Sequence, residues 1–188
     1  QNSPLLPPQP LANKSMDKKK TFILLGIFWL VIVGGFIGFK EYTLRTGQEV
    51  LLKTTPVDPR DLFRGDYVVL RYDISNIDSG VVVAERTDFK SGDRVYVGLE
   101  IKEKYTVATK IYSTAPKGGL YIKGTVKDIS GNSFNVEYGI ESYFVPEGEG
   151  KTIERQLGRS VDVKVSIDKS GNSVIKALLI DDQEVKFK

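Results

Sequence analysis

Five aspartates lie between residues 58 and 78, and their carboxylates could hold a metal ion or a glycan. Carboxylate oxygens are the ligands that calcium prefers, so this group favours a metal- or glycan-binding module as one hypothesis. The spacing does not follow that of a calcium-binding loop, and helix capping or solvation explains most of these side chains. We expect no metal site and keep the carboxylate-based module as an alternative. The five residues are Asp58, Asp61, Asp66, Asp73 and Asp78.

Hydrolytic chemistry has few candidate groups, because the chain contains no His and no Cys. This composition excludes a His general base, a Cys nucleophile, thiolate zinc sites and disulfides. A Ser or Thr nucleophile with a Lys base would remain. The stretch KEYTLRTGQEVLLKTTP, residues 40–56, offers four Thr and no Ser. We therefore expect no catalytic residues, no cofactor and a protein that is not an enzyme.

A single apolar stretch, residues 21–39, carries no charged side chain. Its length matches the roughly 20 residues that a helix needs to cross the hydrocarbon of a bilayer. Lys18, Lys19 and Lys20 precede it, which places the N-terminus in the cytoplasm and the rest of the chain in the periplasm or outside the cell. Membrane lipid is then a partner. A signal peptide is the alternative, although no clear cleavage site follows.

Gly34 and Gly38 stand four residues apart within this stretch. That spacing lets a second helix approach closely, so both are candidates for helix packing in an oligomer or with a partner. The general frequency of Gly in membrane helices explains the pair equally well.

The composition divides the chain into four segments. Residues 1–20 are Pro-rich and basic and are expected to be disordered, and residues 21–39 form the transmembrane helix. Residues 40–55 form a connector and a first strand, and residues 56–188 form an extracytoplasmic β domain. Acidic and basic side chains are nearly balanced beyond residue 40, which argues against a nucleic-acid partner.

Alternating apolar residues predict strands through most of the domain. Short turns separate them, at residues 102–104, 130–132 and 168–172, and two later strands are expected at residues 173–180 and 184–187. Many short strands without a long amphipathic helix predict an antiparallel β-sandwich or open barrel behind one N-terminal transmembrane helix. The expected apolar faces comprise Val95, Val97, Leu99 and Ile101; Tyr105, Val107 and Ile111; Leu120, Ile122 and Val126; Phe134, Val136, Tyr138 and Ile140; and Val161, Val163, Val165 and Ile167.

The stretch VDPRDLFRGDYVVLRYDI reads as one helical turn followed by a strand. Asp58 is a suitable N-cap, Pro59 suits the first helical position, and Gly65 suits a left-handed stop. The strand should bury Val68, Leu70, Tyr72 and Ile74 on one face. Arg64, Asp66 and Tyr67 are candidates for contact with a partner, and we expect the last two to bridge this turn to a neighbouring element.

The loop FVPEGEG, residues 144–150, is the expected neighbour, and it lies within the segment YGIESYFVPEGEGKTIE, residues 138–154. Phe144 and Val145 should finish a strand, and Pro146 should end its pairing. Gly148 and Gly150 allow positive φ angles. A rigid loop of this kind could meet a partner, with Tyr143, Glu147 and Glu149 as candidate contacts.

Gly65-Asp66-Tyr67, Leu70 and Tyr72 spell G-D-Y-x-x-L-x-Y, and this resembles the bacterial GDYXXLXY family. The FVPEG segment and the single anchor are similar too, so the resemblance covers residues 20 to 188. It implies an anchored β domain and, often, a neighbouring multi-pass membrane protein as partner. It supplies no catalytic residue.

Residues 63–70, FRGDYVVL, are also similar to a strand of type I signal peptidases. Those enzymes use a Ser just after the anchor, which this chain lacks. The sequence therefore favours a membrane-anchored, non-enzymatic envelope protein whose β domain binds or supports a membrane-protein partner or assembly. A signal-peptidase-like hydrolase is the alternative.

Overall fold

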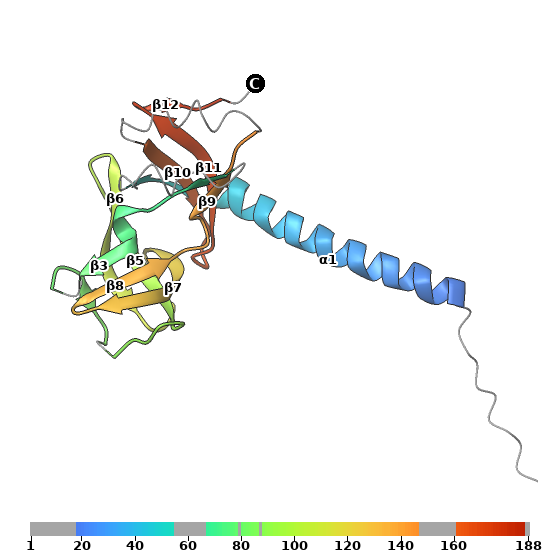
Figure 1. The fold of residues 1–188 in the computed structure, drawn as a ribbon, viewed down its shortest axis with the longest axis horizontal. Coiled ribbons are helices and arrows are strands. Elements are labelled where there is room, and N and C mark those ends of the chain that lie inside the picture. Colours follow the sequence, from blue (N-terminus) through green and yellow to red (C-terminus); the bar gives the residue numbers. More distant parts are fainter. Residues whose placement is uncertain (1–17, 55–66, 79, 87, 147–160, 187–188) are drawn as a thin grey trace, which may run out of the picture. The chain divides into compact units, whose positions relative to one another are not determined.

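The structure is a computed structural model that describes residues 18–54, 67–78, 80–86, 88–146 and 161–186. The chain divides into two compact units, residues 1–39 and residues 40–188. The described part is mainly β, with one long apolar helix near the N-terminus (Figure 1). This confirms the fold class expected from the sequence.

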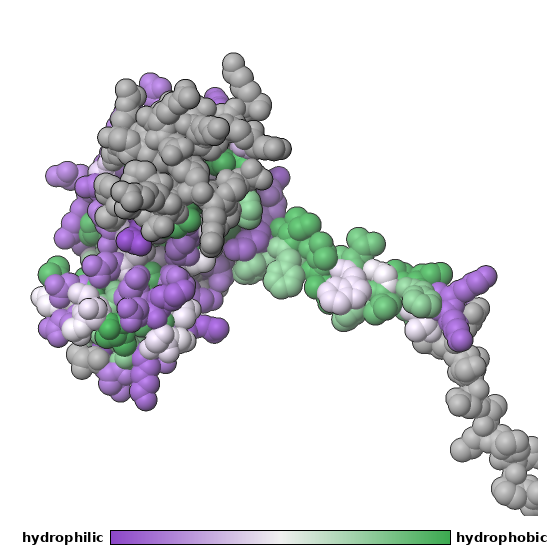
Figure 2. Space-filling model, viewed as in Figure 1, coloured by the Kyte–Doolittle hydropathy of each residue, from purple (hydrophilic) through white to green (hydrophobic). Residues whose placement is uncertain are grey.

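Helix α1, Lys18–Thr46, has no charged side chain between residues 21 and 39, and the face seen in Figure 2 is mostly hydrophobic along this stretch. Nearly all of its side chains up to Phe39 are exposed, and it is long and apolar enough to cross a membrane. A helix that is hydrophobic on all sides needs an apolar environment. The last turns, residues 40–46, belong to the β unit and continue the helix into the range where the sequence suggested a connector.

An antiparallel four-stranded sheet has the order β1-β10-β11-β12. Its strands are β1 (Gln48–Lys53), β10 (Val161–Ile167), β11 (Ser173–Ile180) and β12 (Gln183–Glu184). Val50 pairs with Val165 and Leu52 with Val163, so the predicted valine face of β10 is buried as expected. Strand β12 lies at the start of the predicted last strand, and residues 187–188 lie outside the described part.

A six-stranded sheet curls into half a barrel, with the order β3-β8-β7-β5-β6-β4 (Figure 1). Its strands are β3 (Asn76–Asp78), β4 (Val83–Ala84), β5 (Arg94–Lys102), β6 (Tyr105–Tyr112), β7 (Leu120–Ser130) and β8 (Ser133–Glu137). Only β4 pairs in parallel, with β6, among these described strands. A two-stranded sheet joins β2 (Tyr67–Val69) to β9 (Ser142–Phe144), and one apolar core collects side chains from all three sheets.

Two of the predicted apolar faces are wrong in part. Gly98 pairs with Lys110 and Leu99 with Ala108, so Thr109 is an extra residue that forms a β-bulge in β6. The bulge moves Tyr105 and Val107 to the face opposite Ile111, because one inserted residue reverses the alternation. Ile101 is 49% exposed, since β5 loses its pairing with β7 after Leu99.

The strand predicted from residue 66 is shorter than expected. Strand β2 ends at Val69, Tyr72 makes a single bridge to Thr54, and Asp73–Ser75 form a 3-10 turn, η1. The alternation of burial is nevertheless as predicted, because Val68, Leu70, Tyr72 and Ile74 all lie in the core.

Candidate functional site

The two motif segments of the sequence lie side by side. Strand β2 pairs with β9 in antiparallel register, with Tyr67 opposite Phe144 and Val69 opposite Ser142. The backbone N–H of Leu70 extends this pairing by donating to the carbonyl of Glu141 at 2.7 Å. The backbone therefore joins the GDYxxLxY segment to the YGIESYF segment. Of the FVPEGEG loop expected as the neighbour, Phe144 lies opposite Tyr67, and residues 147–150 lie outside the described part.

Two buried tyrosines lock these segments together by exchanging hydrogen bonds. The Tyr72 hydroxyl donates to the carbonyl of Ile140, and the Tyr138 hydroxyl donates to the carbonyl of Ile74, each at 2.5 Å. We call these four residues the tyrosine clasp. Burial, and secondarily the charge of Glu141, raises the pKa of both phenols well above the usual value near 10. Both phenols are therefore neutral donors at physiological pH.

Glu141 shapes the turn behind the clasp. One carboxylate oxygen accepts from the backbone N–H of Tyr138 at 2.5 Å, and Gly139 between them has a φ of 76°. Its backbone carbonyl is the acceptor for Leu70. Sequence analysis did not single out this residue, and a Glu three positions after a Tyr gives no pattern that would have done so.

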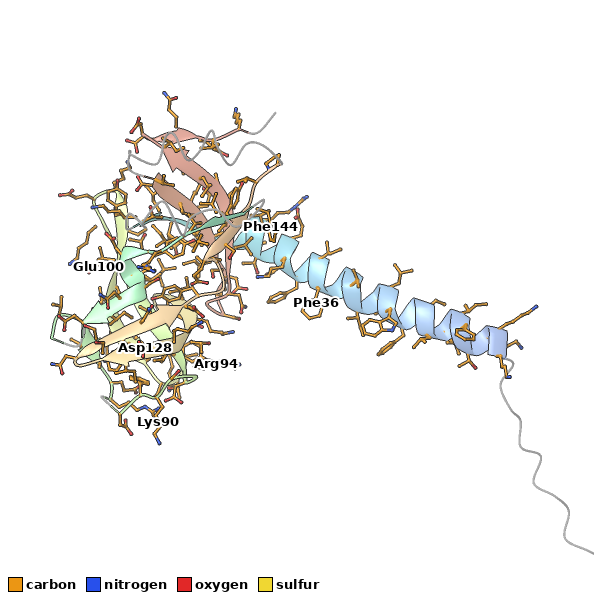
Figure 3. The ribbon with its side chains drawn as sticks, viewed as in Figure 1. Phe36, Lys90, Arg94, Glu100, Asp128 and Phe144 are labelled. Atoms are coloured by element: carbon orange, nitrogen blue, oxygen red, sulfur yellow. The ribbon has the colours of Figure 1, made fainter. Side chains whose placement is uncertain are left out.

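The outer side of β9 borders an open groove of about 410 Å³. Phe144 is 78% exposed there, while its neighbour Val145 is in the core (Figure 3). Tyr143 is half-buried, and its pKa is raised by burial first and by the charge of Glu184 second. The groove is lined by Lys40, Gly139, Ile140, Ser142, Tyr143, Phe144, Ser173, Val174 and Ile175.

The end of helix α1 is bound into the β unit. The fully buried Thr43 donates its hydroxyl to Asp168 at 3.0 Å, and its carbonyl accepts from the Ser166 hydroxyl at 2.7 Å. Burial would raise the pKa of Asp168, but hydrogen bonds from Asn172, Ser170 and Thr43 outweigh it and hold the pKa below its usual value. The Asp168 carboxylate therefore accepts hydrogen bonds both from the β10–β11 turn and from the end of helix α1.

A buried carboxylate, Asp162, lies on the face of β10 that the alternation predicted to be exposed. It accepts a hydrogen bond from the Tyr105 hydroxyl at 2.9 Å, and the Lys104 ammonium is 3.6 Å away. Lys104 also pairs with Asp182. The second oxygen of Asp162 has no hydrogen-bond partner among the described residues. Sequence analysis missed this cluster because it expected only one face of β10 to be covered.

A further feature is the edge strand β4, with the residues on either side of it. Val81 is 81% and Val83 62% exposed, whereas Val82 between them is buried. The backbone N–H groups of Val81 and Val82 donate to the carbonyl of Asp78, which fixes the approach to the strand. Strand β4 pairs with β6 on one side only among the described strands. Its outer edge thus presents apolar side chains.

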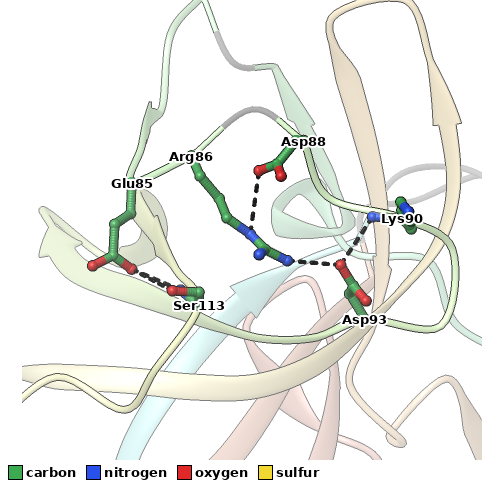
Figure 4. Close-up of polar contacts among 6 residues, drawn as sticks. All are labelled: Glu85, Arg86, Asp88, Lys90, Asp93 and Ser113. Atoms are coloured by element: carbon green, nitrogen blue, oxygen red, sulfur yellow. Dashed lines mark hydrogen bonds and ion pairs between the residues drawn. The ribbon is translucent and has the colours of Figure 1, made fainter.

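Ionic contacts hold the loop after β4 in place (Figure 4). The Arg86 guanidinium lies 2.9 Å from Asp93 and 3.5 Å from Asp88, and it stacks over the Phe89 ring at 4.7 Å. Asp93 also accepts the backbone N–H of Lys90 at 3.0 Å. On the other side, Glu85 accepts from the backbone and hydroxyl of Ser113. These contacts therefore fix the conformation of the residues beside the β4 edge.

Many predicted site residues lie outside the described residues, and their roles stay predictions. Of the predicted structural residues, Leu70 and Tyr72 are buried in the core, and Pro146 is exposed after β9. A side chain at Gly34 or Gly38 would meet no atom within 4 Å, which leaves room for helix packing. The residues outside are Asp58, Pro59, Arg64, Gly65, Asp66, Glu147, Gly148, Glu149 and Gly150.

Carboxylates form no cluster of three or more with metal-binding geometry in the part of the chain that the structure describes. Asp58, Asp61 and Asp66 lie outside that part. Asp78 accepts the backbone N–H of Gly80 at 2.8 Å, so it shapes the turn before β4.

Comparison with known proteins gives one match. The family model described as "GDYXXLXY protein" matches residues 29–178. The chain belongs to the GDYXXLXY family. The matched range contains both halves of the tyrosine clasp, the edge strand β4 and the end of helix α1. No curated protein and no solved structure matches the chain. The GDYXXLXY signature thus includes residues that join two distant segments of the β unit by hydrogen bonds.

Proposed function

We propose that this GDYXXLXY protein is a membrane-anchored, non-enzymatic envelope protein whose β domain binds a membrane-protein partner. Helix α1 supports the anchor by its length and apolar surface. The lysines before it support a cytoplasmic N-terminus and a β domain in the periplasm or outside the cell. The family match agrees with the sequence resemblance, which implies an anchored β domain.

The observation that carries the binding proposal is the exposed apolar edge of β4. Natural proteins cover such edges or place charges on them, because an unpaired strand invites another strand to pair. The exposed side chains here are Val83, in β4, and Val81, in the turn before it. Burying each would contribute about 1.5–3 kcal/mol. An edge held in place by the Arg86 contacts but left apolar is suited to a partner that covers it.

Strand addition is the binding mode that this edge fits. The partner would contribute an extended segment whose backbone pairs with β4, while apolar side chains cover the two valines. A strand made of only two residues gives few backbone hydrogen bonds, so the valine contacts would supply much of the affinity.

A photo-crosslinking amino acid at Val83, in the full chain expressed in its native host, tests this proposal. The expected result is a crosslink to one integral membrane protein, with no such crosslink from Ile129 at the β7–β8 hairpin. Val83→Lys should abolish copurification of that protein with an unchanged melting temperature, because surface substitutions change stability by about 0.5 kcal/mol or less. Ile129→Lys is the matched control and should retain the partner.

The binding proposal fails if both lysine variants retain the partner equally, or if only soluble proteins crosslink to position 83. The topology has a separate test. Protease added outside intact spheroplasts should digest the β domain, and protection of the domain would reverse the orientation. Cleavage of a signal-peptide substrate by the purified protein, lost when one Thr or Lys is replaced, would establish the hydrolase alternative.

A further inference from the structure

The groove beside β9 contains a residue whose distance from the bilayer is set by the chain itself. Lys40 lines the groove together with Tyr143 and Phe144, and it belongs to the β unit. It is also the first charged residue after the apolar stretch that ends at Phe39. If residues 21–39 cross the membrane, the Lys40 ammonium lies at the boundary between hydrocarbon and headgroups.

Lys40 is held close to the body of the β unit. It lies one helical turn before Thr43, about 4.5 Å along the axis, and Thr43 is hydrogen-bonded to Asp168 and Ser166. The other wall of the groove, Ser142 to Phe144, is fixed by pairing with β2. The groove wall that carries Phe144 therefore belongs to the same compact unit as Lys40.

The side chains of this wall suit the membrane interface. The Phe144 side chain is 78% exposed although its neighbour Val145 is buried, so the Phe144 ring adds little to the packing of the core. Tyr143 has an apolar ring and a polar hydroxyl, the amphipathic form that is enriched where headgroups meet acyl chains. A lysine beside two aromatic residues suits this interface, because the ammonium can bind the anionic phosphate of a headgroup while the rings contact hydrocarbon.

We propose that Phe144 and Tyr143 dip into the lipid interface beside the anchor, so that β9 and Lys40 form a second, peripheral contact with the bilayer. This contact rests on the proposed anchoring of helix α1. It assigns lipid as the partner of Tyr143, which the sequence marked only as a contact for some partner. It also assigns the β9 surface to lipid, whereas the β4 edge serves the protein partner.

Tryptophan fluorescence tests the contact in vesicles of phosphatidylethanolamine and phosphatidylglycerol that contain the full-length chain. The chain has one tryptophan, Trp29, inside the apolar stretch. Trp29→Phe with Phe144→Trp moves the probe to the groove, and Trp29→Phe with Val83→Trp moves it to the β4 edge as a matched control. Two quenchers are compared: lipids brominated near the headgroup and aqueous acrylamide.

We expect the tryptophan at position 144 to be quenched by the brominated lipids, shielded from acrylamide and shifted to shorter emission wavelengths than the one at position 83. Equal acrylamide quenching at the two positions, without lipid quenching at 144, would overturn the proposal. Shielding from acrylamide without lipid quenching would also overturn it, because a second copy of the chain would then cover the groove. Failure of deep brominated lipids to quench Trp29 in the wild type would instead refute the anchor.

Discussion

Replacing Tyr72 with Phe removes one hydroxyl from the tyrosine clasp and leaves the ring in place. The carbonyl of Ile140 then loses its donor in the core, which costs about 1–3 kcal/mol of unfolding free energy. For a domain of this size each kcal/mol lowers the melting temperature by roughly 2–4 °C, so the expected decrease is roughly 2–12 °C. Tyr138→Phe should have a similar effect through the carbonyl of Ile74.

Thermal melts of the full chain in detergent, followed by circular dichroism, measure this decrease. Tyr96→Phe is the matched control, because Tyr96 is partly buried and its ring packs edge-on against Tyr121. The double variant of Tyr72 and Tyr138 should lose less than the two single losses combined, since both bonds join the same two segments. If Tyr72→Phe and Tyr96→Phe have the same melting temperature, the clasp does not hold the two motifs and our reasoning about them is wrong.

Three further outcomes follow from the same structure. Above pH 10 the clasp tyrosines ionise in the unfolded chain but stay neutral in the folded chain, so the free energy of unfolding should fall by up to about 1.4 kcal/mol per pH unit for each tyrosine. In alkaline melts, the double Phe variant should show a shallower fall. Gly47→Ala should cost roughly 1–3 kcal/mol in denaturant unfolding, because a Cβ would lie 2.7 Å from the Thr43 carbonyl, whereas Gly118→Ala meets no atom within 4 Å. Asp162→Ala should cost about 1–3 kcal/mol in the same assay, and Asp182→Ala at the exposed end of the cluster about 0–1 kcal/mol.

Alternation in the sequence was enough to predict most of the buried faces. A strand covered on one side repeats every two residues, and the run ending at Ile140 follows that rule without interruption. The prediction is wrong where local geometry breaks the period. The β-bulge at Thr109 reverses the alternation within β6, and no residue type marks it.

The candidate surfaces were harder to predict, because they depend on contacts between distant segments. The two clasp bonds join residues 68 and 64 positions apart, and a Tyr in an alternating strand looks the same whether or not its hydroxyl finds a carbonyl. Asp162 was missed because β10 is covered on both faces. Strand β4 has two residues, too few for any periodic signal.

The geometry of two motif residues, Leu70 and Tyr72, supports the structural role that the sequence predicted for them. In the GDYxxLxY segment, Leu70 and Tyr72 are buried and donate hydrogen bonds to the 138–141 turn. They therefore connect two segments that lie far apart in the sequence. Closing so long a loop costs conformational entropy that the clasp must offset. A change in either residue should therefore reduce partner binding only as far as it unfolds the domain. Exposed residues such as Val83 and Phe144 are different, because they add nothing to the core. Substitution there should change binding to protein or lipid while the melting temperature stays constant.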